Sequence, residues 1–503
     1  MKIVQSGKLV ALIKACLVVV LASCSTVLLA FQVSVNSDQR HPGIGLFFAA
    51  LSPENAVADN ALDQITPLWR DGYAGVIWDI LRFLVPPQTM DDEALDPGRS
   101  GTEPSVGIAS QITPQEHPST KVWRRLMGYL EERSGQRFRG DITYLHQWIW
   151  DQTYDPHPEY LFFKRTWYSE IDPRFADFFQ DGIEATIRLD EIDWGGVSVN
   201  GIPPLEYPET ITAGSADYLD DEHVVFGLSV NGAARAYPKR ILAWHEMALD
   251  RVGGVELTVV YCTLCGTVIP YESIVNREHF KFGTSGLLYR SNKLMFDHQT
   301  KSLWNTFEGV PVVGPLVGTH TRLTRRSVVT TTWGEWRRLH PETTVLSLET
   351  GHSRDYGEGA AYREYFESNN LMFDVPERDD RLPLKAEIVG VLLEGDEAKH
   401  STLAMSVEFL SRRPVYMDIY DGRQLVVLTS VKGASRVYEA SDISFERFDN
   451  EGHLVDSHGA RWMVSEDNLI RLAGRGERLN RVPSQRAFWF GWYAQFPATR
   501  LVH

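Results

Sequence analysis

The second half of the chain carries short apolar runs that are typical of β-strands. From about residue 187, runs such as "VVFGLSVNGAARAYP", "ELTVVYC" and "RSVVTTTW" are rich in β-branched residues and are separated by glycine and proline. Asn231-Gly232, inside the first run, is a strong signal for a hairpin turn. This pattern predicts a mostly-β region with few long helices.

A helical pattern precedes these strands, over residues 119–186. In "KVWRRLMGYLEERSGQ", Val122, Leu126 and Leu130 fall on one side of a helix and charged residues on the other. Asp172-Pro173 is a plausible helix start. A small helical region followed by a mostly-β region predicts the α+β fold class.

The first 35 residues have the pattern of an export segment. Lys2, Lys8 and Lys14 accompany the apolar stretch "LVALIKACLVVVLASCSTVLLAF", and a positive start before an apolar run is typical of export signals. "LASC" resembles a lipobox, which would make Cys24 a lipidated N-terminus. About 20 apolar residues span a bilayer, so an uncleaved anchor helix is an equal alternative, and cleavage after Ala30 is a third. Each version predicts an extracytoplasmic protein; the first two also predict membrane association.

Residues 36–118 are predicted to be a poorly ordered linker. "PPQTMDDEALDPGRSGTEPSVGIASQITPQEHPST" is rich in proline, glycine, serine and acids and has few large apolar residues. The stretch before it, "TPLWRDGYAGVIWDILRFLV", has the pattern of a short amphipathic helix.

Two strings recur in the same order along the β region. "ELTVVYCTLCGTV" resembles "QLVVLTSVKGASR", and "TTWGEWRRLHPETTVLS" resembles "RAFWFGWYAQFPATRLV". The recurrence predicts an internal duplication, with chance likeness of β-rich strings as the alternative. The predicted organisation is a signal peptide or anchor (1–35), a linker (36–118), a helical region (119–186), a β-rich module (187–350), a connector (351–384) and a second, degenerate copy of the module (385–503).

Composition and charge limit the classes of partner that the protein is expected to bind. The chain has 503 residues, of which 43% are hydrophobic and 11% aromatic, which supplies ample core material for a globular protein. Its formal net charge is −16. An acidic surface argues against nucleic acid as a partner and offers no basic patch for anionic lipids.

The cysteine count directs attention to one pair. Cys16 and Cys24 lie in the export segment, so the folded part contains only Cys262 and Cys265. Secreted proteins that are stapled by disulfides have more cysteines at longer spacings, and a C-x-x-C bridge closes too small a loop to stabilise much. A structural disulfide remains an alternative, but chemistry is the favoured interpretation.

The internal comparison supports that interpretation. We match Thr429 and Lys432 of the second string to Cys262 and Cys265 of the first. The repeated fold therefore does not require the cysteines.

A C-x-x-C pair is suited to thiol–disulfide exchange, because one thiolate attacks a disulfide and the other thiol resolves the mixed disulfide. We predict this role for Cys262 and Cys265, with a thiol or disulfide protein or a small molecule as redox partner and no cofactor. His245 is a candidate base for the thiol, and Asp297 and His298 are further candidate helpers. The competing interpretations are a core or surface histidine at 245 and ordinary loop residues at 297 and 298.

Two other classes of function remain open. Cys262, Cys265, His245 and His298 together make a Cys2His2 ligand set for zinc or copper. Alternatively, the β surface serves a non-catalytic envelope module that binds a partner or a glycan.

Several blocks resemble the DUF3179 family of bacterial and archaeal proteins, over roughly residues 120–503. They include "RAYPKRILAWHEM", "VVYCTLCGTVIPYES" and "FGTSGLLYRSNKLMFDHQTKSLWNTFEGVPVVGP". Some members of this family are named as selenoproteins with selenocysteine in the C-x-x-C motif. The resemblance therefore implies redox-active Cys262 and Cys265. Similar proteins tend to have Asn-Asp where this chain has Leu249-Asp250, so no role is carried over to position 249.

The sequence after the cysteines argues against a thioredoxin fold. In thioredoxin the motif opens a helix whose dipole stabilises the thiolate. Here Gly266, Val268, Ile269 and Pro270 follow, which is poor helix material. We therefore expect side chains or turn amides to stabilise a reactive thiolate.

Overall fold

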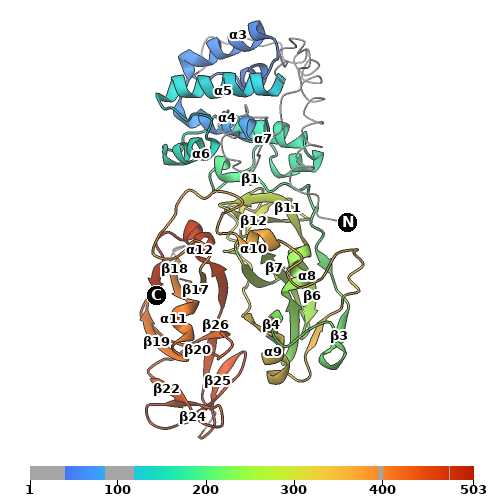
Figure 1. The fold of residues 1–503 in the computed structure, drawn as a ribbon, viewed down its shortest axis with the longest axis vertical. Helices are drawn as coiled ribbons and strands as arrows, with labels where there is room; N and C mark the ends of the chain where they lie inside the picture. Colours follow the sequence, from blue (N-terminus) through green and yellow to red (C-terminus); the bar gives the residue numbers. More distant parts are fainter. Residues whose placement is uncertain (1–39, 85–117, 395–399, 475) are drawn as a thin grey trace, which may run out of the picture. The chain divides into compact units, whose positions relative to one another are not determined.

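The computed structural model describes residues 40–84, 118–394, 400–474 and 476–503 (Figure 1). These residues form two compact units, a helical unit up to Asp181 with Arg188–Glu191, and a β-rich unit of Gly182–Ile187 and Ile192–His503. Within the described ranges no helix has the length and apolarity that crossing a membrane requires. The predicted export segment, residues 1–35, lies outside them.

The first unit is helical because apolar residues recur at helical spacing and pack together. In α5, Val122, Leu126 and Leu130 are buried as the pattern predicts. The Asp172-Pro173 start is also present, but it opens a 3₁₀ helix, Pro173–Phe178, in which Asp172 accepts from the Arg174 amide. The α-helices of this unit are α2 (Ile44–Ala49), α3 (Asn55–Ile65), α4 (Ala74–Leu81), α5 (Pro118–Ser134), α6 (Ile142–Asp151) and α7 (Tyr160–Ser169).

The linker prediction is wrong over residues 44–81, which form α2, α3 and α4. α3 buries Ala58, Ala61, Leu62 and Ile65 on one face, a pattern that the exposed polar residues between them obscure. α4 is buried on all sides rather than amphipathic. The remainder of the predicted linker, residues 85–117, lies outside the described part of the chain.

The second unit contains two β regions, which we call the first β region (residues 192–350) and the second β region (residues 385–503). The first has helices α8 (Lys239–His245) and α9 (Trp333–Leu339), and strands β1 (Ile192–Trp194), β2 (Leu205–Glu206), β3 (Thr210–Thr212), β4 (Val224–Val230), β5 (Ala233–Pro238), β6 (Met247–Val252), β7 (Val255–Cys262), β8 (Thr267–Glu272), β9 (Ile274–Val275), β10 (Glu278–His279), β11 (Phe282–Tyr289), β12 (Asn292–Asp297), β13 (Leu303–Asn305), β14 (Val310–Val313), β15 (Val329–Thr332) and β16 (Thr344–Leu346).

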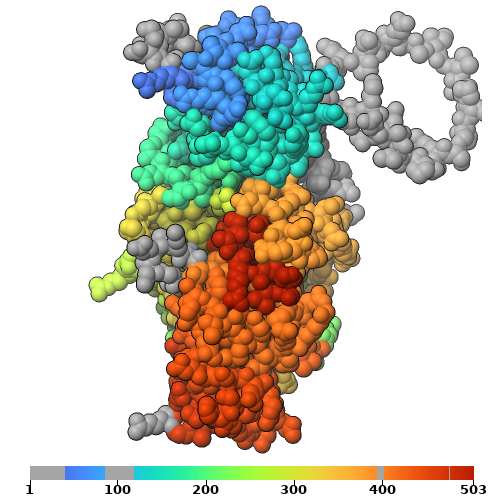
Figure 2. Space-filling view, turned by 90° about the vertical axis from the view of Figure 1, so that its left-hand side faces the viewer, coloured from blue at the N-terminus to red at the C-terminus, as the bar shows by residue number. Residues whose placement is uncertain are grey.

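The second β region has helices α11 (Val407–Ser411) and α12 (Trp489–Gln495). Its strands are β17 (Glu387–Glu394), β18 (His400–Ser406), β19 (Val415–Tyr420), β20 (Arg423–Thr429), β21 (Ser435–Glu439), β22 (Phe445–Phe448), β23 (Leu454–Asp456), β24 (Arg461–Val464), β25 (Asn468–Arg471), β26 (Arg478–Val482), β27 (Ser484–Phe488) and β28 (Arg500–Val502). The connector between the regions contains α10 (Arg363–Glu367). Figure 2 shows the C-terminal residues, in red, bordered by orange segments of the same unit.

One sheet of each region has the same strand order and pairing. β15-β4-β5-β16 and β27-β17-β18-β28 both contain two antiparallel pairs followed by a parallel pair. In both, the middle hairpin leads into a short helix, α8 or α11. The predicted hairpin at Asn231-Gly232 is confirmed as the β4–β5 turn.

A tryptophan motif explains one of the recurring strings. The indole N–H of Trp336 donates to Thr343 Oγ1 at 2.9 Å, and that of Trp492 donates to Thr499 Oγ1 at 3.0 Å. Each indole lies against a strand glycine: a Cβ atom added at Gly227 or Gly390 would be 2.3 Å from the ring of Trp336 or Trp492. The strings resemble each other because the same tryptophan packs over the same gap in both sheets.

The three-stranded meanders β6-β7-β8 and β19-β20-β21 also correspond, and they correct the predicted register. The tight turns pair Val252 with Val255 and Tyr420 with Arg423. Counted from these turns, Cys262 corresponds to Ser430 and not to the Thr429 that we matched to it; the two strings set side by side without a gap also place Ser430 there. The turn of the second meander is one residue shorter, so Lys432 remains the counterpart of Cys265.

Candidate functional site

The cysteines lie in the turn between two antiparallel strands. β7 ends at Cys262, which pairs with Thr267 at the start of β8. Gly266 has a φ of +62°, and a Cβ atom there would be 3.1 Å from the ring of Phe488. Glycine is therefore required both by the backbone conformation and by the close packing. No helix follows the motif, as the sequence predicts.

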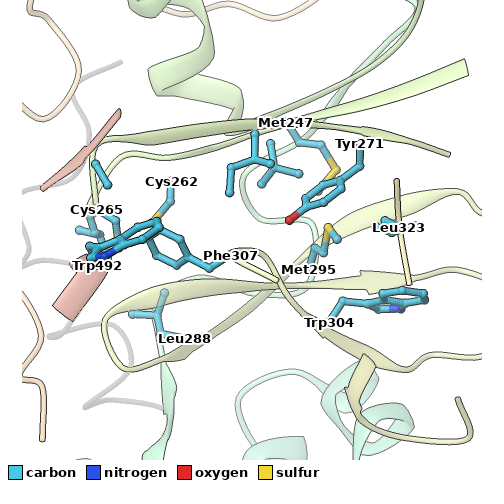
Figure 3. Packing of buried hydrophobic residues seen from close by; sticks show 14 of the residues in the cluster. Met247, Cys262, Cys265, Tyr271, Leu288, Met295, Trp304, Phe307, Leu323 and Trp492 are labelled. Carbon is cyan, nitrogen blue, oxygen red and sulfur yellow. The ribbon is translucent and has the colours of Figure 1, made fainter. Parts of the chain in front are cut away.

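Both thiols are reduced and buried, with exposed fractions of 2% for Cys262 and 0% for Cys265. They belong to the largest apolar cluster around the turn, beside Trp492, Phe307 and Leu288 (Figure 3). An apolar surrounding normally disfavours a thiolate, so any stabilisation must come from specific donors.

Such donors converge on Cys262. Burial raises the pKa of the Cys262 thiol, but the Cys265 thiol and the main-chain amides of Lys293 and Cys265 donate to its sulfur and bring the pKa below its usual value. The same geometry raises the pKa of Cys265, through burial and through donation of its proton to Cys262. Cys265 Sγ also lies 3.3 Å from the carbonyl oxygen of Ser291, a second acceptor for that proton. The site thus distinguishes its two sulfurs.

A buried ion pair adjoins the cysteine turn. Lys293 Nζ lies 2.9 Å from Glu246 Oε2 and 3.3 Å from the Glu246 carbonyl oxygen. Glu246 Oε1 accepts from the hydroxyl of Thr263, between the cysteines, at 2.8 Å, and from the hydroxyl of Tyr362, in the connector, at 3.2 Å. The carboxylate therefore links the end of α8, the cysteine turn, β12 and the connector.

Sequence reasoning missed Lys293, and it noted Glu246 only as a polar residue near the motif, without a partner or a role. Lys293 precedes three apolar residues in β12, "NKLMFD", and all six residues of that strand are buried; Glu246 follows the helix α8 with a left-handed backbone φ of +55°. A charge in an apolar strand is the signal available from sequence, but it does not identify the partner.

His245 forms its hydrogen bonds with residues outside the cysteine turn. Its Nδ1 lies 2.9 Å from the carbonyl oxygen of Pro203, and its Nε2 lies 2.6 Å from the hydroxyl of Tyr356. Burial lowers the pKa of His245 to about 4. A neutral imidazole can donate from Nδ1 and accept the Tyr356 proton at Nε2. One ring nitrogen thus holds the Pro203 segment and the other holds the connector, so His245 acts as an anchor in this arrangement; it makes neither of these bonds to a thiol, as the predicted base would.

Asp297 and His298 belong to a turn of the fold. Asp297 Oδ2 accepts from the indole of Trp304 at 2.9 Å and from the hydroxyl of Thr300 at 2.8 Å. In the second β region Asp456 accepts from the indole of Trp462 at 2.9 Å in the same way. His298 packs on the ring of Phe296, and burial and nearby lysines lower its pKa.

The structure does not bring the proposed metal ligands into one set. His245 is bonded to Pro203 and Tyr356, and His298 lies on the β12 turn beside Phe296. Among the residues that the structure describes, no group of three histidine, cysteine, aspartate or glutamate side chains is arranged to hold a metal ion.

Other polar residues near the motif have structural partners. Asp250 accepts from Arg235 at 2.6 Å and from the hydroxyl of Tyr237 at 2.7 Å. Leu249, at the departure from the family pattern, is a buried strand residue paired with Thr258.

Two segments cover the cysteine turn. From the connector, the Tyr365 hydroxyl donates to the carbonyl oxygen of Leu264 at 2.8 Å. From the second β region, the Phe488 amide donates to the carbonyl oxygen of Cys265 at 2.7 Å. α12 then crosses so closely that a Cβ atom added at Gly491 would be 3.0 Å from Cys265 Sγ. The thiols therefore lie between parts of the chain that are far apart in sequence.

The corresponding turn of the second β region borders an open cavity of about 830 Å³. Register places Pro414 at the position of Glu246, and counting back from Asp297 and Asp456 places Gly452 at that of Lys293. These residues line the cavity together with Ser430, Val431 and Lys432. The second region thus lacks the cysteines and the ion pair together.

The fold and site define an α+β protein with a buried, asymmetric dithiol at a β-turn. A model of the DUF3179 family, described as a protein of unknown function, matches residues 199–499. The chain belongs to this family, which confirms the resemblance seen in the sequence. Comparisons with curated proteins and with solved structures gave no match.

Proposed function

We propose that this protein is a thiol–disulfide oxidoreductase, with Cys262 as the attacking thiolate and Cys265 as the resolving thiol. The observation that carries the proposal is a pair of free, buried thiols in one β-turn whose surroundings differ, so that the pKa of Cys262 is lowered and that of Cys265 is raised. In this proposal, turn amides stabilise the thiolate, as a helix N-terminus does in thioredoxin. The thiolate is the nucleophile in disulfide exchange.

The proposed reaction balances without a cofactor. The Cys262 thiolate attacks a substrate disulfide, which breaks its S–S bond, forms a mixed disulfide and releases the first product thiolate. The sulfur of Cys265 then displaces the second product thiolate and forms the Cys262–Cys265 disulfide. Two electrons pass from the cysteine pair to the substrate; the Cys265 proton passes to one product thiolate, and the other product thiolate takes from solvent the proton that Cys262 released on ionising. Because the thiols are buried, a covering segment must open before substrate binds.

The proposed location is outside the cytoplasm, with attachment to the membrane through the N-terminal segment. The support is the sequence alone: the basic start, the long apolar stretch and the "LASC" string at Cys24. The proposed partner is a thiol or disulfide protein, or a small-molecule disulfide.

The two β regions are proposed to descend from one duplicated module. Support comes from the matching strand orders, from the paired tryptophan–threonine hydrogen bonds and from the paired aspartate–tryptophan turns. Only the first region retains a pair of thiols.

The test uses the full chain, purified in detergent without chelator. Thiols are titrated across defined glutathione buffers by alkylation and mass measurement, and metal content is measured on the same sample. A reversible two-electron transition, in the range of known thiol catalysts, supports the proposal. A pair that stays reduced or stays oxidised across the whole range overturns it, and stoichiometric zinc or copper with masked thiols favours the metal-binding alternative.

A further inference from the structure

Burying the Glu246–Lys293 ion pair is unfavourable in free energy. The side chains are 10% and 6% exposed. Removing two charges from water costs free energy that their mutual attraction often fails to recover. The backbone of Glu246 is also left-handed, with a φ of +55°, a conformation that favours glycine. Stability alone therefore gives a poor account of this pair.

A comparison of the two β regions indicates that the ion pair is present because of the dithiol. At the corresponding positions the second β region has Pro414 and Gly452, next to Ser430 and Lys432 in place of the cysteines. Its strands pair in the same order without these charges. The ion pair is thus dispensable for the meander and accompanies the thiols.

Contacts connect the pair to both sulfurs. The main-chain amide of Lys293 donates to Cys262 Sγ, and Lys293 Nζ holds Glu246. Thr263, between the two cysteines, donates to Glu246. The negative charge of Glu246 raises the pKa of Cys262 and of Cys265.

The other titratable groups that face the thiols are hydroxyls. Tyr261 lies on β7, while Tyr362 and Tyr365 come from the connector. α12 presents Gly491, which has no side chain, to Cys265. Glu246 and Lys293 are therefore the nearby groups that supply full charges.

We infer that the Glu246–Lys293 ion pair tunes the reduction potential of the Cys262–Cys265 pair, with Glu246 disfavouring the thiolate and Lys293 limiting that effect. This inference rests on the proposed function. A destabilised thiolate makes the reduced state less favourable, so Glu246 makes the pair more reducing, whereas a stabilised reduced form gives an oxidant. Both are positioning residues, since neither side chain bonds to a sulfur.

The test compares reduction potentials of full-chain variants in glutathione buffers. E246Q keeps the shape of the side chain and removes its charge. We expect it to shift the dithiol–disulfide equilibrium at least tenfold towards the dithiol, which corresponds to about 30 mV. E246D, which keeps the charge, should stay within threefold of the wild type. An unchanged potential in E246Q, or equal shifts in E246Q and E246D, overturns the inference.

A second comparison protects the test against misfolding, because E246Q leaves a buried lysine unpaired. K293M leaves the carboxylate without its counter-ion, and E246Q/K293M removes both charges. We expect the double variant E246Q/K293M to have a higher reduction potential than K293M. Equal potentials overturn the inference.

Thiolate absorbance in the ultraviolet, followed against pH with a C262S reference, separates the two hypotheses. If the wild type forms no reversible disulfide, the proposed function fails, yet a lower pKa of Cys262 in E246Q still demonstrates the electrostatic coupling. If the wild type cycles and that pKa does not move, the coupling alone fails.

Discussion

The two β regions repeat a framework and differ in what they place at one turn. Both have a tryptophan over a strand glycine and an aspartate that accepts from a tryptophan. At the turn after β7 the first region buries two thiols under α12, whereas at the turn after β20 the second region has Ser430 bonded to Glu335 of α9 at 2.8 Å. Glu335 and Gly491 are corresponding residues of the two helices. The comparison teaches that framework and chemistry are separable: each region's helix covers the other region's turn, and only one turn carries sulfur.

Removing the sulfurs is the most direct test of whether the cysteines serve chemistry and not the framework that the two regions share. We expect C262S and C265S each to abolish disulfide exchange while leaving the fold intact, because the second region forms the same meander without cysteines. Exchange is measured with a disulfide substrate, and folding by urea unfolding. K432A, at the counterpart of Cys265, is the matched control and should keep wild-type exchange. An unfolded single cysteine variant would assign the pair a structural duty instead.

A pH titration tests whether His245 of the first region anchors the connector. The pKa of His245 is about 4 in the folded chain and about 6.5 in an unfolded one. As the pH falls, the unfolded chain takes up this proton first, so the contribution to stability is present above pH 6.5 and is lost between about pH 6.5 and 4. The loss amounts to roughly 3 kcal/mol in the free energy of unfolding.

The measurement is urea unfolding of the wild type and H245N across this range. H245N should flatten the profile, whereas H279N, at an exposed histidine, should leave it unchanged. Parallel profiles for the wild type and H245N would contradict the anchoring role. The counterpart of His245 in the second region is Arg413, which is exposed, so no matching loss is expected there.

Alanine at the two strand glycines tests whether the framework is equivalent. A Cβ atom at Gly227 or Gly390 would be 2.3 Å from an indole, so we expect G227A and G390A each to lower the free energy of unfolding by roughly 1–3 kcal/mol, as overpacking does. G214A, where nothing lies within 4 Å, is the control. A large loss in one region only would show that the two sheets are packed by different means.

The smallest expected effect is the coupling energy between each indole and its threonine, roughly 0.5–1.5 kcal/mol for one hydrogen bond. W336F and W492F each remove the bond to Thr343 or Thr499. Loss of the bond leaves a buried hydroxyl with fewer partners and should cost about 1–3 kcal/mol, with further loss from the smaller ring. T343V alone and combined with W336F completes one double-mutant cycle, and T499V alone and combined with W492F completes the other. Coupling energies that differ widely between the cycles would contradict equivalence.

Local sequence patterns predicted those parts of the molecule that depend on neighbouring residues. The hairpin at Asn231-Gly232 and the buried face of α5 follow from turn chemistry and from helical spacing. The failure of the thioredoxin pattern was likewise visible in Gly266 and Pro270. By contrast, α2 and α3 were missed; the buried face of α3 is made largely of small residues with polar ones between them. A helix was expected in the stretch that contains α4, but α4 is buried on all sides rather than amphipathic.

The candidate site was predicted only in its sulfurs. Lys293 meets Glu246 across a fold, and Tyr356 reaches His245 from the connector; neither pairing has a sequence signature. The match of Thr429 to Cys262 was off by one residue, because the strings set side by side place Ser430 there. The shorter loop after Ser430, which keeps Lys432 opposite Cys265, is visible only when the strands are paired.

The cover that α12 provides has a consequence for how the protein is made. Chains are synthesised from the N-terminus, and their parts begin to fold in that order. The cysteine turn is therefore complete long before Gly491 and Trp492 exist to close over it. Until the last residues arrive, Cys262 and Cys265 are accessible to oxidants and to other thiols. The final stretch of the chain thus decides when the dithiol becomes a protected site, and a protein that ended before α12 would expose its sulfurs permanently.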